Sequence, residues 1–315
     1  MPITLQQAKV GQQDKVAASI IELFQRKSEI LDSMVFDDAI SPQGGSTLAY
    51  TYQYELTPST AAGRAINSEY TPGEALRDEK TTHLKVFGGS YEIDRVIANT
   101  SAKQLNEVTY QSEKKVAATI NYFHHMLING NEEDNALEFD GLATLLEGTD
   151  TEDDEALDLT TMDEAKANAL VNRIDELIAK LIRKPDMIIT SSKGKIKLAQ
   201  AARTLGYFTS SEDAFGRKAQ FYDGIRIVDA GQYYNGSALV NIVGDATTTA
   251  YYFVCFGQDE LVGLSPEGNK LVETHLPDFT EAKAVHKGDV EAVWGLALKN
   301  SKAAGVIKNI TVASA

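Results

Sequence analysis

The chain has 315 residues, a mass of 34.3 kDa and a formal net charge of −15, and its length allows two domains or one large one. Apolar residues make up 43% of the chain and charged residues 24%, which excludes a protein that is disordered throughout. The sequence has no apolar run long enough to cross a membrane and no N-terminal secretory pattern, so we expect no membrane partner.

The negative charge is concentrated in one part of the chain. Residues 116–165 contain fourteen acidic residues and no Lys or Arg, whereas the rest of the chain has thirty-one acidic and thirty basic residues. This balance argues against a basic groove for nucleic acid. Asp150, Glu152 and Asp154 have the spacing that begins a calcium loop, but the glycine and the final glutamate of such a loop are missing. We therefore interpret the acidic segment as a solvated surface.

The first third of the chain contains one helix pattern and two strand patterns. Apolar residues at helical spacing predict a helix over 13–34, and turn residues follow at 41–47. Alternating polarity predicts a strand over 48–56. A second extended stretch runs from 82 to about 96, and its Gly88-Gly89 pair predicts a bulge or bend.

The segment 57–81, which joins these two strands, has few large apolar side chains. A connection of this length without a core of its own is uncommon inside a compact domain. We therefore expect it to be disordered or ordered by another molecule, and interpret it as a long arm.

A long helix is predicted over 101–129, with Thr100 or Ser101 as its N-cap and Asn129-Gly130 at its end. One apolar stripe runs along it, formed by Leu105, Val108, Val116, Ile120, Phe123 and Leu127. At about 1.5 Å per residue the helix is a strut of roughly 40 Å that crosses the molecule.

The rest of the chain predicts an α/β layer and then strands. A capping box at Thr161–Glu164 opens a helix to about 181, a buried strand lies at 187–189, and a second helix begins after Ser191 or Ser192. Asp223-Gly224 predicts a hairpin turn. Further strands are expected at 249–256, 270–276, 289–299 and 305–312.

No catalytic motif is present. Residues 263–270 are the nearest approach to a phosphate loop, lack its Gly-Lys-Ser/Thr ending, and are interpreted as a turn between strands. His124 and His125 are neighbours on a helix and point in different directions, so we expect one buried and one exposed histidine rather than a metal site. The single cysteine, Cys255, lies in an apolar strand and is expected to be a small buried hydrophobe. We predict no catalytic residue, cofactor or metal.

The order of these elements resembles the major capsid proteins of tailed bacteriophages with the HK97-like fold. Three local phrases also resemble that family: Phe139–Leu142 after the long helix, Leu181–Asp186 before the buried strand, and Phe221–Asp229 following Gly216-Arg217-Lys218. The resemblance covers nearly the whole chain, and its specificity lies in the order of the parts.

The resemblance implies an α+β fold with five parts. They are an N-terminal arm at 1–46, an extended β-hairpin loop with its base strands at 47–98, the spine helix of the peripheral domain at 99–134, an axial domain at 135–255, and C-terminal strands at 256–315 that belong mainly to the peripheral domain.

The resemblance also implies a function. The chain would self-assemble into hexamers and pentamers of an icosahedral virion shell that encloses double-stranded DNA, contacted without sequence specificity. Assembly would take place in the bacterial host cytoplasm. The implied partners are further copies of the chain, a portal protein, a decoration protein and a separate scaffolding protein, because about 45 residues before the loop are too few for a built-in scaffold.

The extended loop is expected to lie on the adjacent subunit and to pair with its charges. The residues expected to make this inter-subunit contact are Arg64, Glu69, Arg77, Asp78, Glu79 and Lys80. Some members of the family crosslink a loop lysine to a neighbour's asparagine. Lys80 or Lys85 with Asn300 or Asn309 would be the candidates, although we interpret these lysines as ordinary exposed side chains.

Two other interpretations stay open. Encapsulin nanocompartments share the architecture and enclose enzymes instead of DNA. The third interpretation is a soluble α/β enzyme that uses the carboxylates of 132–164, which predicts a small oligomer and a pocket with perturbed carboxylates.

Overall fold

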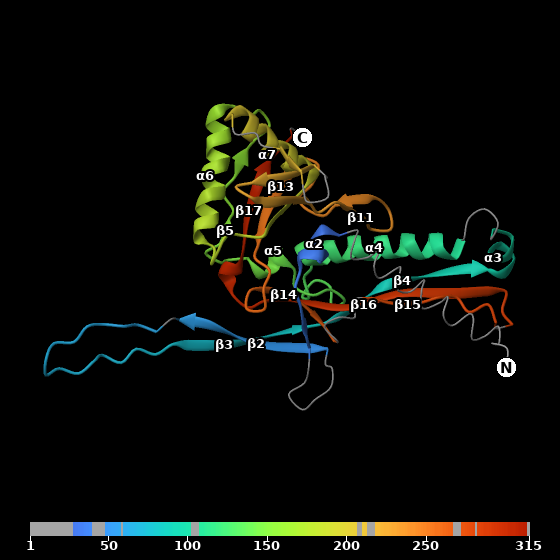
Figure 1. The fold of residues 1–315 in the computed structure, drawn as a ribbon, viewed down its shortest axis with the longest axis horizontal. Coiled ribbons are helices and arrows are strands. Elements are labelled where there is room, and N and C mark those ends of the chain that lie inside the picture. Colours follow the sequence, from blue (N-terminus) through green and yellow to red (C-terminus); the bar gives the residue numbers. More distant parts are fainter. Residues whose placement is uncertain are drawn as a thin grey trace.

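The computed structural model describes residues 28–39, 48–57, 59–101, 107–206, 210–212, 218–266, 272–280 and 282–313. Figure 1 shows two lobes and a projecting hairpin. One lobe lies along the longest axis and contains helix α4 (Glu107–Asn129) and a five-stranded sheet. The second lobe contains an eight-stranded sheet and rises above one end of α4. The hairpin of β2 (Ala49–Thr57) and β3 (Leu76–His83) extends past that end.

Strands from distant parts of the sequence build the five-stranded sheet. Its order is β1-β14-β16-β15, and β4 also pairs with the long strand β16. The strands β1 and β14 were not predicted, because strands of three or five residues are too short to show alternation. The turn predicted over 263–270 is wrong for residues 263–265, which lie in β14. The bounds are β1 (Phe36–Asp38), β4 (Lys85–Asp94), β14 (Leu261–Ser265), β15 (Glu273–His275) and β16 (Val285–Leu298).

The glycine pair in β4 does not form the expected bulge. The register between β4 and β16 runs without a shift from Lys85 to Asp94. Gly88 has a φ of +156°, and a Cβ there would lie 2.0 Å from the carbonyl oxygen of Val290. Glycine is therefore required because the partner backbone passes very close. The predicted stretch is instead interrupted at Leu84, between β3 and β4.

Helix α4 confirms most of the predicted strut. Val116, Ile120, Phe123 and Leu127 are all buried, so the apolar stripe faces the core. Its 23 residues span roughly 35 Å. The predicted start is wrong, because Thr100 and Ser101 belong to a separate helix, α3 (Arg95–Ser101). Residues 102–106 lie outside the described residues.

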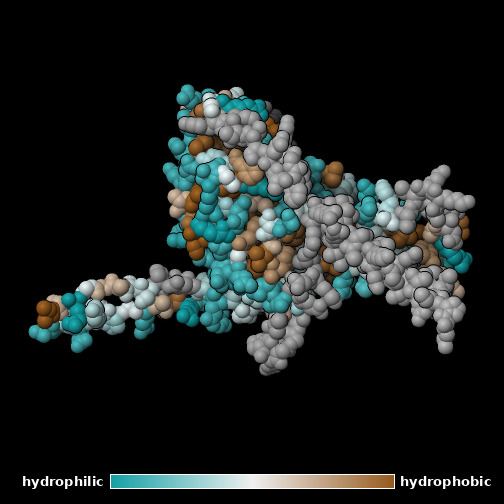
Figure 2. Space-filling model, in the orientation of Figure 1, coloured by the Kyte–Doolittle hydropathy of each residue, from teal (hydrophilic) through white to brown (hydrophobic). Residues whose placement is uncertain are grey.

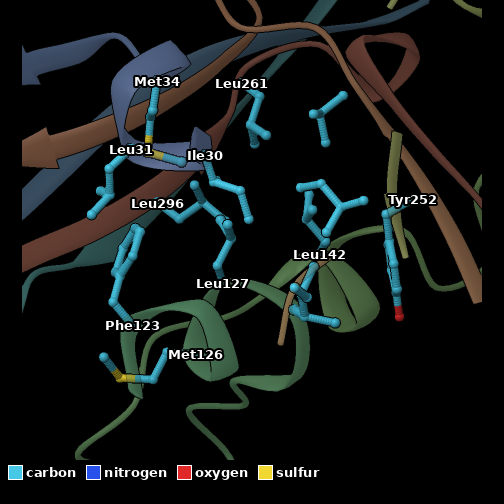
Figure 3. Packing of buried hydrophobic residues seen from close by; sticks show 14 of the residues in the cluster. Ile30, Leu31, Met34, Phe123, Met126, Leu127, Leu142, Tyr252, Leu261 and Leu296 are labelled. Atoms are coloured by element: carbon cyan, nitrogen blue, oxygen red, sulfur yellow. The ribbon is translucent and has the colours of Figure 1, made fainter. Parts of the chain in front are cut away.

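The main core joins α4 to both sheets (Figure 3). Its centre is an aromatic group in which the ring of Phe123 lies edge-on to Trp294 at 4.6 Å between centroids, and Phe87 lies 5.4 Å from the same ring. The short helix α2 (Glu29–Ser33) packs on α4 through Ile30, and Ser28 caps it. Of the helix expected over 13–34, residues 13–27 lie outside the described residues.

The eight-stranded sheet has the order β5-β17-β13-β7-β10-β9-β8, and β6 also pairs with β17. Helices α6 (Glu164–Lys180) and α7 (Ser192–Thr204) cover one face, and α4 and α5 (Leu142–Leu145) lie on the other. The strands are β5 (Glu152–Asp153), β6 (Leu157–Asp158), β7 (Met187–Thr190), β8 (Ser210–Glu212), β9 (Lys218–Tyr222), β10 (Ile225–Asp229), β13 (Thr248–Val254) and β17 (Ala304–Thr311).

Local signals in this lobe were mostly correct. Ser191 caps α7 by accepting from the backbone N–H of Gly194 at 3.1 Å. Asp223 and Gly224 both have positive φ, as a two-residue hairpin turn of the predicted kind requires. The predicted capping box named the wrong N-cap residue: Asp163, rather than Thr161, accepts a hydrogen bond from the backbone N–H of Lys166 at the start of α6.

The C-terminal segment 256–315 is divided between the lobes. Strands β14 to β16 lie in the five-stranded sheet, but β17 follows the short helix η1 (Ser301–Ala303) and pairs with β13 in the eight-stranded sheet. We expected these strands to belong mainly with the spine helix. β17 is the strand that lies elsewhere, and its apolar residues pack under α6. A small unpredicted hairpin, β11 (Gln232–Tyr234) and β12 (Leu239–Asn241), lies over α4.

Candidate functional site

The projecting hairpin is the most distinctive feature of the surface. From Ala49 to Thr57, β2 pairs with β3, and along the outer part of β3 the side chains of Leu76–Glu79 are exposed. Cross-strand polar contacts stabilise it: Tyr54 donates to Asp78 at 3.1 Å and the amide of Gln53 donates to Glu79 at 2.9 Å. Such cross-strand pairs each add a small amount of stability to a two-stranded ladder. Beyond its base, where Tyr52 is buried, the described part of the hairpin is thus held by its own ladder rather than by a hydrophobic core.

The hairpin tip, residues 59–75, has no regular secondary structure apart from a turn. Arg64 shapes it by donating to the carbonyl oxygens of Ala65 and Ser68, and its guanidinium lies 5.4 Å from the centroid of the Tyr70 ring. Ile66 is 91% exposed. Figure 2 shows apolar atoms at this end of the hairpin, far from the body. An apolar side chain held this far from the core marks a surface for another molecule.

The hairpin base is fixed to the body by a polar contact. Asp37 of β1 accepts from the Tyr50 hydroxyl at 2.9 Å and from Lys299 Nζ at 3.2 Å. Lys299 also lies 5.3 Å from the centroid of the Tyr50 ring. Partial burial opposes the charged form of Asp37, but these hydrogen bonds outweigh it and hold the pKa of Asp37 below its ordinary value. Nearby, Tyr52 is buried against β14 and β16.

All six residues expected to contact a neighbouring subunit lie on the hairpin. Five of them are exposed and Lys80 is half-buried. Asp78 and Glu79 already accept hydrogen bonds within the hairpin, and Arg64 binds the tip backbone. Contact with a neighbour remains a prediction for this set: Arg64, Glu69, Arg77, Asp78, Glu79 and Lys80.

Sequence reasoning missed the residues that fix the hairpin base. Asp37 and Lys299 are 262 positions apart, so no local pattern could join them. The alternation that predicted β2 did include Tyr50, but nothing in it indicated a partner. The apolar tip residues Ile66 and Tyr70 were visible in the sequence and were passed over because the segment as a whole is polar.

The acidic segment is less solvated than expected, because several of its carboxylates bind bases from other elements. These ion pairs are Glu132–Lys85, Glu152–Lys308, Asp153–Arg173 and Asp158–Lys166. The hydrogen bond from Lys308 lowers the pKa of Glu152, and bonds from Thr160 and Lys166 lower that of Asp158 to about 2. A general acid needs the opposite shift. Within the described ranges, no group of acids, histidines or cysteine is placed to hold a metal.

The histidines and the cysteine are packed side chains. Ser28 Oγ lies 2.7 Å from Nε2 of His124, and burial lowers the pKa of this histidine to about 4. His125 is half-buried against the Tyr233 ring at 4.1 Å, rather than exposed. Cys255 is fully buried, which confirms its prediction as a core residue, and burial raises the pKa of its thiol to about 11.

Three of the four crosslink candidates are engaged within the chain. Lys85 binds Glu132 at 2.7 Å and the carbonyl of Ala136 at 2.9 Å, so it is not an ordinary exposed lysine. Asn300 caps η1, and Asn309 donates to the Asp154 carbonyl at 2.8 Å. Among the described residues, no helix has the length and apolar character that a membrane crossing requires.

Similar proteins were found by comparison of structures and not by comparison of sequences. No family model and no curated protein matches the chain. The encapsulin of the holo-SrpI complex from Synechococcus elongatus PCC 7942 matches with a TM-score of 0.60 at 12% identity, over 90% of this chain and 88% of that one. A chain of Mycobacterium phage Bobi matches with a TM-score of 0.60 at 10% identity, over 91% of each chain.

The capsid of a native GTA particle matches with a TM-score of 0.59 at 12% identity, over 90% of each chain. Each of these matches covers about nine-tenths of this chain. At such low identity they establish the fold and leave the function to be tested. The chain has the α+β HK97-like capsid fold, which phage capsids and encapsulins share.

Proposed function

We propose that this chain is the major capsid protein of a tailed bacteriophage. It forms hexamers and pentamers of an icosahedral shell that encloses double-stranded DNA. The observation that carries the proposal is the projecting hairpin, whose ladder holds Ile66 far outside the body with 91% of its surface exposed. An arm without a core gains stability when it lies on a neighbour, and many such contacts add up across a closed shell.

Each lobe has a role in this proposal. The eight-stranded sheet with α6 and α7 is the axial domain, and β17 is part of it. Helix α4 and the five-stranded sheet form the peripheral domain, and the hairpin is the extended loop. The loop lies on the adjacent subunit through Ile66 and through the charged set of Arg64, Glu69, Arg77, Asp78, Glu79 and Lys80.

The partners follow from the same proposal. Other copies of the chain are the main partner, and a separate scaffolding protein guides their assembly in the bacterial host cytoplasm. A portal protein occupies one vertex of the virion, and a decoration protein binds outside. The net charge of −15 supports a non-specific relation to DNA, because a basic inner wall would bind packaged DNA tightly.

A second candidate function is the shell of an encapsulin-type nanocompartment. The match to the encapsulin from Synechococcus elongatus PCC 7942 favours it as much as the phage match favours the first, with a TM-score of 0.60 in both cases. The two candidates predict the same subunit contacts and differ in what the shell contains.

One experiment separates the candidates. The chain is produced with its neighbouring genes, and particles are purified after nuclease treatment and examined by light scattering and negative-stain electron microscopy. A capsid protein gives closed shells that protect double-stranded DNA. An encapsulin gives closed shells that contain a protein cargo and no protected DNA. A stable dimer or tetramer, even with a scaffolding gene present, contradicts both.

A further inference from the structure

Two chain segments cross between the lobes at one place. Residues 255–260 lead from β13 to β14, and residues 299–303 lead from β16 to β17. They are joined by backbone hydrogen bonds, from Cys255 to Ala303 at 2.8 Å and from Lys299 to Glu260 at 2.9 Å. The loop before β7 packs on them. The lobes are therefore joined by a small backbone junction.

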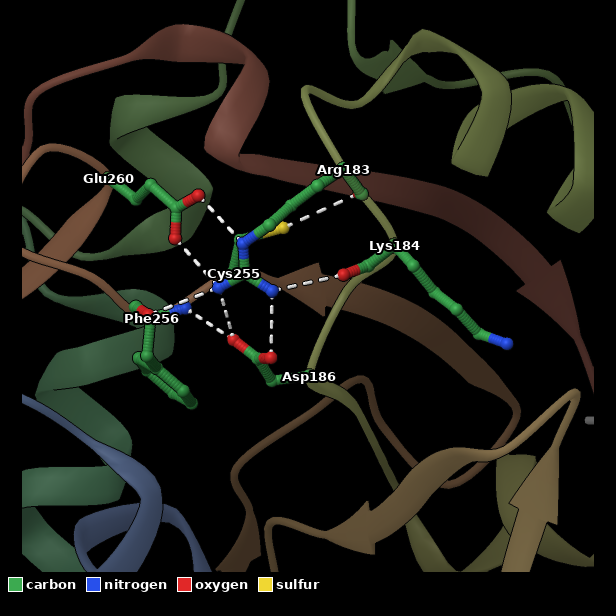
Figure 4. A network of polar contacts seen from close by, with 6 residues as sticks. All are labelled: Arg183, Lys184, Asp186, Cys255, Phe256 and Glu260. Atoms are coloured by element: carbon green, nitrogen blue, oxygen red, sulfur yellow. Dashed lines mark hydrogen bonds and ion pairs between the residues drawn. The ribbon is translucent and has the colours of Figure 1, made fainter.

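Arg183, in the loop before β7, holds this junction (Figure 4). Its guanidinium donates to both carboxylate oxygens of Glu260 at 2.7 Å, to Asp186 at 2.7 and 2.8 Å, and to the Phe256 carbonyl at 3.1 Å. Asp186 in turn accepts from the Phe256 N–H at 2.8 Å. The planar guanidinium group of Arg183 holds its N–H donors in a fixed geometry and can bind several acceptors at once, which the ammonium group of a lysine cannot do.

The same contacts continue to the hairpin base. The carbonyl of Glu260, whose carboxylate binds Arg183, accepts from the backbone of Lys299. The side chain of Lys299 binds Asp37, which also holds the hydroxyl of Tyr50 on β2. An unbroken chain of contacts thus runs from the entry to β7 in one lobe to the first strand of the hairpin.

We propose that Arg183 and Lys299 are positioning residues that set the direction of the hairpin relative to the eight-stranded lobe. Lys299 acts directly at the hairpin base, and Arg183 acts through Glu260. The inference rests on the proposed function in one respect, because the direction of the hairpin matters only if the hairpin must reach a neighbouring subunit.

The neighbouring lysine provides a matched control. Lys184 follows Arg183, but its side chain points away from the junction and binds Asp223 at 2.6 Å on the surface. Both groups of that pair are more than half exposed, so its loss has little effect on the stability of the protein. Lys184→Met therefore removes a charge beside Arg183 without touching the chain of contacts.

The test is an intramolecular distance measured by pulsed electron paramagnetic resonance. In a Cys255→Ala background, spin labels are placed at Asn168→Cys on α6 and Thr71→Cys on the hairpin tip. Labelled chain is mixed with an excess of unlabelled chain, so that only distances within one subunit contribute. We expect a narrow distribution in this parent and in Lys184→Met, and a shifted distribution roughly twice as wide in Lys299→Met and Arg183→Met.

The coupling itself is tested by the double variant. If both residues act through the same series of contacts, the distance distribution of Arg183→Met/Lys299→Met is no broader than that of Lys299→Met alone. A parent-like distribution in Arg183→Met, or additive broadening in the double variant, overturns the proposal. Arg183→Lys replaces Arg183→Met if the latter does not fold, and the same two outcomes apply to it. The distances are measured whether or not shells form, so they are independent of the test of the proposed function.

Discussion

At the scale of single residues, the stability of the body depends on a few large buried rings. Trp294 is fully buried and contacts Phe36, Phe87 and Phe123. Such a side chain contributes through its buried area and through ring packing that smaller residues cannot replace. The sequence contains one Trp, but nothing local to it shows that three other rings meet it.

We expect Trp294→Ala to lower the free energy of unfolding by about 3–5 kcal/mol, because it leaves a cavity among these rings. Val86→Ala, on β4 of the same sheet but 52% exposed, is the control and changes it by less than about 1 kcal/mol. Urea denaturation of the unassembled subunit measures both. Equal losses in the two variants would contradict the assignment of the core.

A glycine comparison tests the close strand approach at Gly88. We expect Gly88→Ala to cost more than about 2 kcal/mol, because its Cβ would lie 2.0 Å from a backbone oxygen of β16 that cannot move freely. Gly63→Ala on the hairpin tip meets nothing within 4 Å and changes stability by less than about 0.5 kcal/mol. The same denaturation measurement applies, and an unchanged Gly88→Ala protein would refute the argument.

The ion pair of Asp153 with Arg173 predicts a pH dependence. Burial opposes ionisation of Asp153, but the bonds from Arg173, with N–O distances of 2.7 and 2.5 Å, outweigh it and lower the pKa of Asp153 below its ordinary 3.8. The pair therefore adds stability above the unfolded pKa and loses it as the pH falls through the folded pKa.

Asp153→Asn is expected to cost about 1–3 kcal/mol at pH 7. The difference from the parent protein shrinks as the pH falls below about 4. Thermal unfolding at a series of pH values measures it. Asp154→Asn, an exposed neighbour, is the control and shows no such difference. A difference that is constant with pH would show that Asp153 acts by packing alone.

At the scale of elements, long periodic patterns were predictable and short strands were not. The stripe of α4 and the alternation of β2 were correct because each repeats over several turns or residues. Strands β1, β14, β11 and β12 were missed, since tertiary pairing rather than local pattern holds them in place. The helix start near Ser101 was wrong because a cap residue there lies inside α3.

The hairpin could be located from the sequence, whereas its fixing point could not. The absence of a core in 57–81 was visible, but Asp37 and Lys299 meet Tyr50 from opposite ends of the chain. The charged residues of the hairpin were easy to identify. The structure adds that Asp78 and Glu79 accept hydrogen bonds within the hairpin, and that Ile66 is the most exposed large apolar side chain among the hairpin residues whose burial is described.

The hairpin tip predicts an assembly phenotype. Ile66→Asp places a charge where the proposal requires an apolar contact, so we expect a folded subunit whose closed shells fall at least about tenfold in yield. Thr71→Asp adds the same charge to an exposed polar position of the same tip and retains assembly. Size-exclusion chromatography with circular dichroism checks both. Normal shells from Ile66→Asp would refute the role of the tip.

At the scale of the whole molecule, the order of elements was more informative than any motif. The hairpin, the long helix and the two sheets occur in an order that predicted the HK97-like fold, which the structural matches bear out over about nine-tenths of the chain. The return of β17 to the eight-stranded sheet was not predictable, because nothing in a strand pattern states which sheet it joins. The fold does not determine what the shell contains either.

A cryo-electron microscopy map of particles purified from cells that carry the chain and its neighbouring genes would show directly whether the hairpin lies on an adjacent subunit. We expect a closed icosahedral shell of pentamers and hexamers in which the hairpin tip, with Ile66, is covered by an adjacent subunit. A discrete oligomer without a shell, or a shell in which the hairpin lies free in solvent, would contradict the proposed function.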